Sequence, residues 1–222
     1  AVIIFFYFQK KSLPTFQNII FLVILTVVTM NNITELCAVH MEVDKNDLSI
    51  PALYLVNCLY FTFNLTFGIL FTIYNLSAFD IYGKLDKRAI SLIKTSLLLP
   101  YFFFLIIIWL SWILSDRYIL LFTIDPVNGY QRGSDLCFYG FCIIKAFFII
   151  FSFIIIIARH RYIPKTKLQI IYFFLVTISS TALLQLFNNG LLIESFGMAL
   201  VTLVYFFFIQ KPEEMMDAST GT

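Results

Sequence analysis

The chain has 222 residues, of which 60% are hydrophobic, 18% aromatic and only 13% charged, with a formal net charge of +2 at neutral pH. Soluble globular domains carry about 25% charged residues, so this composition excludes a water-soluble core and indicates a membrane protein. We therefore expect membrane lipid as a partner and no nucleic acid.

Apolar segments follow one another along the chain. A helix needs about 20 mostly apolar residues to cross the hydrocarbon layer of a membrane. Residues 1–8 are apolar but too short, and we interpret them as the end of a span whose beginning is missing. The predicted fold is all-α, a bundle of about seven transmembrane helices with the first one truncated. The six complete spans are predicted near 17–41, 51–79, 89–115, 136–158, 168–187 and 191–210.

Basic residues favour alternate connections between these spans. Short loops rich in Lys and Arg remain on the cytoplasmic side, which predicts an N-terminus outside and a cytoplasmic C-terminus. The outer connections carry three basic residues, Lys45, Arg117 and Arg132. The inner connections and the C-terminal segment carry ten, namely Lys10, Lys11, Lys84, Lys87, Arg88, Arg159, Arg161, Lys165, Lys167 and Lys211.

The longest connection, residues 116–135, lies on the predicted outer side between the fourth and fifth helices. A β-branched and aromatic run at 120–124 precedes a Pro, Asn and Gly cluster at 126–129 and a second short run. This order predicts an extracellular β-hairpin-like loop, a candidate lid for a pocket below it. An ordinary loop on the membrane surface is the alternative.

Three ionisable residues fall at membrane depth: Glu35, Lys145 and Glu194. Such groups are costly in lipid unless they are paired or hydrated, and each is a candidate for function. Lys145 lies about 14 Å below the outer end of its helix, at 1.5 Å per residue. We therefore predict that at least one of the two carboxylates contacts Lys145 inside the bundle.

Asn57, Asn64 and Asn75 are spaced seven and then eleven residues apart, so they share one helix face with Gly68 and Thr72. That face should point into the protein. Hydrogen bonding between helices is the usual role of Asn in membranes, and we favour it for Asn75. For Asn57 and Asn64 a ligand pocket is an equally open interpretation.

Other polar residues extend this cluster. Asn31 shares a face with Glu35, and Asn188 and Asn189 follow Gln185 at the outer end of another helix. These groups predict a polar cavity in the outer half of the bundle, suited to a small polar or zwitterionic ligand, with packing alone as the alternative. The predicted ligand-binding residues are Glu35, Asn57, Asn64, Lys145, Gln185 and Glu194.

Motifs of enzyme and metal sites are absent from the sequence. It contains no phosphate-binding glycine loop, no HExxH and no two-Cys metal spacing. We therefore expect no catalytic residue, cofactor or metal in this segment. A bridge between Cys37 and Cys58 is conceivable, but free buried thiols are favoured, because Cys is also a common apolar core residue.

The end of the chain, residues 211–222, is predicted to be a cytoplasmic connector after a sensor domain at 1–210. Pro212 followed by two glutamates is typical of the first turn of a helix, so Pro212 and Asp217 are candidates for signal transmission. The stretch 217–221 resembles the D-x-L-T-G-L sequence that opens the catalytic domain of bacterial GGDEF-type diguanylate cyclases. Asp217, Thr220 and Gly221 match, whereas Ser219 and Thr222 replace the leucines.

A second resemblance covers most of the chain. The layout is similar to the N-terminal seven-helix sensory region found ahead of histidine kinase or GGDEF domains in bacteria. The resemblance implies a receptor module in the bacterial inner membrane that regulates a cyclic-di-GMP-synthesising domain, as a homodimer. A small-molecule transporter, the sensor region of a histidine kinase and a purely structural anchor are the alternatives. The matching outer segment, of the type F-x-I-D…G-Y-x-R-G, is Phe122, Ile124, Asp125, Gly129, Tyr130, Arg132 and Gly133.

Overall fold

The computed structural model describes residues 16–43, 50–78, 85–114, 121–125, 129–132, 136–158, 165–187 and 193–210. This part of the chain is almost entirely helical, and each helix, with the π-helical end of the last one included, lies within three residues of a predicted span at both ends. The predicted fragment of a first span, residues 1–8, lies outside the described residues. The helices are α2 (Phe16–Val43), α3 (Ile50–Ala78), α4 (Lys87–Leu114), α5 (Leu136–Ala158), α6 (Lys165–Phe187) and α7 (Ile193–Tyr205), which continues as the π-helical segment η3 (Phe206–Gln210).

Four of these helices are long and apolar enough to cross a membrane. The qualifying segments are Phe16–Met41, Pro51–Ala78, Lys87–Ser111 and Tyr139–Ala158. The apolar parts of α6 and α7 are shorter, at Leu168–Thr181 and Glu194–Phe208. About 20 residues are needed for a complete crossing. The four longer segments meet this length, so the described chain has the helices of a multi-pass membrane protein.

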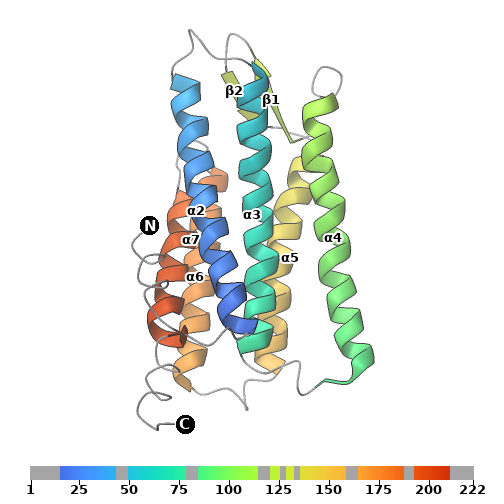
Figure 1. Ribbon diagram of the computed structural model, residues 1–222, viewed down its shortest axis with the longest axis vertical. Coiled ribbons are helices and arrows are strands. Elements are labelled where there is room, and N and C mark those ends of the chain that lie inside the picture. The colour runs from blue at the N-terminus through green and yellow to red at the C-terminus, as the bar shows by residue number, and fades with distance from the viewer. Residues whose placement is uncertain are drawn as a thin grey trace.

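Consecutive helices run in opposite directions along the long axis of the molecule (Figure 1). Helix α3 is central and packs against α2, α4 and α5, while α7 packs against α6 and α2. Helix α4 lies at one edge of the bundle and contacts α3 and α5. Because α5 and α7 also approach the inner face of α3, polar side chains from these three helices can meet inside the bundle.

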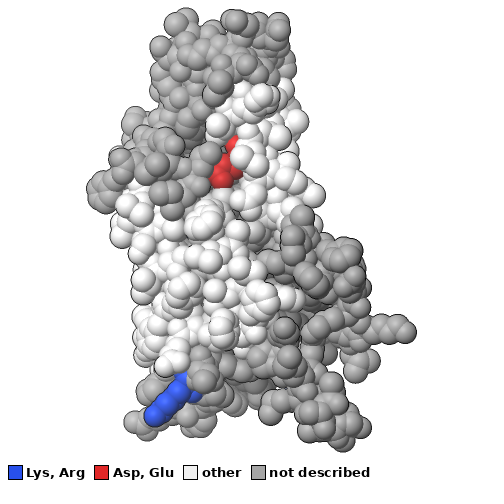
Figure 2. Space-filling view, turned by 90° about the vertical axis from the view of Figure 1, so that its left-hand side faces the viewer, with Lys and Arg blue, Asp and Glu red and all other residues white. Residues whose placement is uncertain are grey.

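The outer surface of the bundle is apolar. On α4, large hydrophobic side chains such as Leu92, Leu99 and Ile113 are 68%, 68% and 74% exposed. The described part of the face in Figure 2 is mostly uncharged, with a small recessed acidic area in its upper part and a basic area at the lower end. Helices that are apolar all round fit a lipid environment, where no water drives polar residues to the outside.

Two short strands, β1 (Phe122–Asp125) and β2 (Gly129–Arg132), pair antiparallel at one end of the bundle (Figure 1). They occupy the connection for which the sequence predicts a hairpin, whose turn residues lie outside the described part. Phe122 is fully buried, and its ring stacks on Phe61 of α3 with a centroid distance of 5.6 Å. Tyr54 contacts the same ring at 5.4 Å. The strand pair is therefore anchored on α3 by an aromatic cluster.

Candidate functional site

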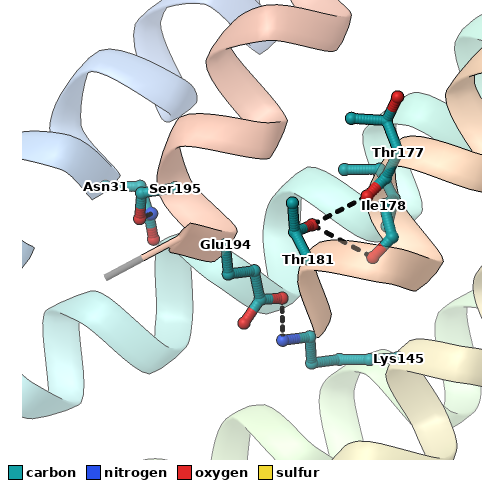
Figure 3. Close-up of polar contacts among 7 residues, drawn as sticks. All are labelled: Asn31, Lys145, Thr177, Ile178, Thr181, Glu194 and Ser195. Carbon is teal, nitrogen blue, oxygen red and sulfur yellow. Dashed lines mark hydrogen bonds and ion pairs between the residues drawn. The ribbon is translucent and has the colours of Figure 1, made fainter. Parts of the chain in front are cut away.

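A salt bridge between Lys145 of α5 and Glu194 of α7 is the centre of the site (Figure 3). The ammonium of Lys145 donates to Glu194 Oε1, and the two side chains are only 19% and 8% exposed. Glu194 lies in the first turn of α7, where the helix dipole favours a carboxylate. The prediction that a carboxylate meets Lys145 inside the bundle is confirmed.

Glu35 of α2 is the second carboxylate of this region and is 6% exposed. It interacts with the hydroxyl groups of Ser195 and Tyr60 and is within electrostatic range of both Glu194 and Lys145. Its Oε1 atom is buried and has no hydrogen-bond partner. Two carboxylates and one ammonium group therefore share the same buried neighbourhood.

Asn31 connects α2 to α7 beside these charges. Its Nδ2 donates to Ser195 Oγ at 2.7 Å, and its Oδ1 is buried without a partner. Ser195 directly follows Glu194 and is 2% exposed. Sequence reasoning missed Ser195, although its place next to an intramembrane glutamate in the first turn of a helix was a usable signal.

A cavity of about 30 Å³ lies against the salt bridge. Its polar lining consists of Lys145, Glu194, Asn64, Thr72 and Ser152, and aromatic rings supply much of the rest. Asn64 is 2% exposed, and neither its Nδ2 nor its Oδ1 has a hydrogen-bond partner. The cavity has room for about two water molecules, whereas pockets for drug-sized ligands measure about 300 to 1,000 Å³.

The three asparagines of α3 are all buried, as their shared face predicts, but they differ in their contacts. Asn57 Nδ2 donates to the Leu53 carbonyl of its own helix at 2.9 Å and is not part of the cavity lining. Asn75 Nδ2 donates to Ser152 Oγ at 3.3 Å, and Asn75 Oδ1 accepts from the Tyr205 hydroxyl at 3.1 Å. Interhelical bonding by Asn75 is confirmed, and only Asn64 faces the cavity.

Several predicted positions are not placed by the structure. Gln185 belongs to α6, but its side chain lies outside the described residues, and so do Pro212 and Asp217. Ser152 and Tyr205 were not predicted, because a single serine or tyrosine in an apolar run carries no distinctive pattern. The buried face of α3 that carries Asn75 was the only indication in the sequence that polar partners lie on the neighbouring helices.

Among the described cysteines, Cys37 and Cys58 have free thiols. The expectation of buried thiols is correct only for Cys58, since Cys37 is exposed on α2 and Cys142 is half-buried. Cys58 Sγ contacts the Ile108 carbonyl of α4 at 3.5 Å. Within the described ranges, no group of three or more His, Cys, Asp or Glu side chains could hold a metal ion.

The chain was compared with protein-family models, curated proteins and solved structures, and none of them matches it.

Proposed function

We propose that this chain is the sensor module of a bacterial membrane receptor, which binds a small polar solute from outside and passes the change to a cytoplasmic output domain. One observation carries the proposal: a buried salt bridge joins α5 to the first turn of α7 beside a polar cavity. Its output is proposed to be a diguanylate cyclase, on the resemblance of residues 217–221 to the opening of that domain.

Burial of the Lys145–Glu194 pair supports a role beyond packing. Removing two charges from water is costly, and well-packed apolar residues in their place are often no less stable. A charged group of a solute that competes for either partner would weaken the link between α5 and α7. The arrangement with the salt bridge and the arrangement without it then have different affinities for the solute. Such a difference is required for a ligand to shift their populations.

Helix α7 provides a route from the salt bridge to the other end of the bundle. Glu194 is in its first turn, and Tyr205 ends it with a hydroxyl bonded to Asn75. The π-helical segment η3 follows directly, and such segments are frequent at functional sites. A displacement of α7 at Glu194 is thereby proposed to reach the segment that leads to residues 211–222.

The distribution of Lys and Arg among the connections supports the proposed orientation. In this proposed orientation the β1–β2 end is outside and the C-terminal end of η3 is in the cytoplasm, and the membrane is proposed to be the inner membrane of a bacterium. The strand pair then covers the outer end of the bundle. A homodimer is proposed because the diguanylate cyclases that residues 217–221 resemble act through two catalytic domains.

The test uses the full-length protein in cells, with cyclic-di-GMP measured as the output. Lys145→Met and Glu194→Gln each break the salt bridge and should change the cyclic-di-GMP level several-fold in the same direction. Lys94→Met is the matched control, because Lys94 lies on α4 with an exposed side chain. Unchanged output from both site variants, at normal expression and membrane insertion, would reject the proposal.

A small-molecule transporter is the second candidate, favoured by the same charge pair beside a cavity. Purified protein in liposomes distinguishes the two. Uptake of a solute that is lost in Glu194→Gln, together with unchanged output in cells, would support transport. If the variants change autophosphorylation of a kinase domain instead of cyclic-di-GMP, the receptor belongs to the histidine kinase type.

A further inference from the structure

We infer that the cavity beside Asn64 is a binding site for a small monovalent cation of about the size of sodium. This cation would be the solute that the proposed sensor binds. The claim that the cation is the signal rests on the proposed function, whereas the claim that it binds does not. Binding itself follows from charge, volume and unpaired polar atoms.

Charge is the first argument. Glu35 and Glu194 are both buried and lie in one electrostatic neighbourhood with Lys145. Among the Lys and Arg side chains that the structure describes, Lys145 is the only one that is not exposed. The cluster thus carries one more carboxylate than ammonium group. A net charge at membrane depth is costly, and one added positive charge balances these three groups.

Volume is the second argument. The cavity measures about 30 Å³, enough for one bare ion and a water molecule but not for an organic solute of several heavy atoms. The size of the cavity therefore favours an ion over an organic molecule as the small polar solute. A divalent ion suits the site less well, because the charge excess is a single unit and no group of three or more metal-binding side chains occurs among the described residues.

The chemistry of the lining is the third argument. Asn64 Oδ1 is an acceptor without a partner and faces the cavity, and the Glu194 carboxylate and the Thr72 and Ser152 hydroxyls belong to the same lining. Carboxylate, carbonyl and hydroxyl oxygens are the ligands of hard cations. The partnerless Asn64 Nδ2 can donate to a water molecule that accompanies the ion. The rest of the wall is apolar.

The experiment measures sodium binding to the purified full-length protein in detergent or nanodiscs. Thermal melting is followed as sodium chloride replaces choline chloride at constant ionic strength, and equilibrium binding of radioactive sodium is measured in parallel. Sodium should raise the melting temperature saturably, since a ligand of the folded state stabilises it, with binding of about one ion per chain. Potassium is run as a second ion.

Asn64→Leu and Glu35→Gln should abolish sodium binding and the sodium-dependent shift. Asn57→Leu is the matched control, because Asn57 is on the same face of α3 but bonds its own helix, and it should keep both. Equal effects of sodium, potassium and choline would overturn the inference, because they indicate screening only. A melting temperature that responds to acid but to no alkali cation would also overturn it, because a proton then balances the charge.

The two proposals fail separately. Sodium binding without any change in cyclic-di-GMP confirms the site and rejects the ion as the signal. An output that responds to Lys145→Met in a protein that binds no sodium overturns the cation site and leaves the sensor proposal standing.

Discussion

At the residue scale, the Lys145–Glu194 pair should dominate the stability of the polar interior. Lys145→Met leaves the Glu194 carboxylate buried without its partner, and breaking a buried pair in this way costs about 3 kcal/mol. We expect a clearly lower melting temperature for Lys145→Met in detergent micelles. Both side chains are less than one-fifth exposed, so solvent screens this interaction little.

The double variant Lys145→Met/Glu194→Gln removes both charges and is the control. It should recover much of the stability lost in Lys145→Met, because no unpaired charge remains. A double variant as unstable as the sum of the two single variants would mean that the ion pair itself contributes nothing.

Tyr205 gives a second prediction at this scale. Its hydroxyl is bonded to Asn75 Oδ1 in a fully buried position, so Tyr205→Phe leaves that oxygen unpaired. The free energy of unfolding should fall by about 1 kcal/mol. Tyr172→Phe, at an exposed position of α6, should have no measurable effect. Equal melting temperatures of Tyr205→Phe and the unaltered protein would contradict the bond.

At the element scale, the packing of α6 on α7 depends on Gly197. A Cβ atom at this position would lie 2.7 Å from Thr181 Oγ1 and 2.8 Å from Thr181 Cγ2. The Thr181 hydroxyl is held by the carbonyls of Thr177 and Ile178 (Figure 3), so the side chain cannot easily turn away. Small residues allow membrane helices to approach closely.

Gly197→Ala should therefore destabilise the bundle by about 1 to 3 kcal/mol, the usual range for overpacking. Thr181→Ala in the same chain removes the two nearest atoms and leaves only Cβ, at 3.1 Å, so it should restore most of the lost melting temperature. Gly140→Ala is a milder comparison, since its Cβ would meet the far end of the Phe104 ring at 3.1 Å. A Gly197→Ala protein of normal stability would show that α6 and α7 are not packed as described.

At the scale of the whole molecule, the orientation predicted from the basic residues can be tested by cysteine labelling. With the four native cysteines replaced by alanine, Val127→Cys between β1 and β2 should react with a membrane-impermeant maleimide in intact cells. Lys87→Cys, at the start of α4, should react only after the membrane is permeabilised. The reverse pattern would show the opposite orientation.

The helices of this protein are determined by the sequence itself. Long apolar runs interrupted by short polar connections leave a membrane chain few options, because every backbone polar group in lipid must be bonded within its own segment. Helix periodicity likewise determines that Asn57, Asn64 and Asn75 share one face of α3, and the cost of a bare ammonium in lipid requires a partner for Lys145.

The tertiary structure alone decided how these groups are combined. Glu194 rather than Glu35 bonds Lys145, because the first turn of α7 begins at the depth of Lys145 on α5. The same packing bonds Asn75 to Ser152 and Tyr205 and leaves Asn64 facing a small cavity without a partner. Contacts between helices depend on their relative depth and rotation, which are set by side-chain packing between distant segments and not by the pattern within any one of them.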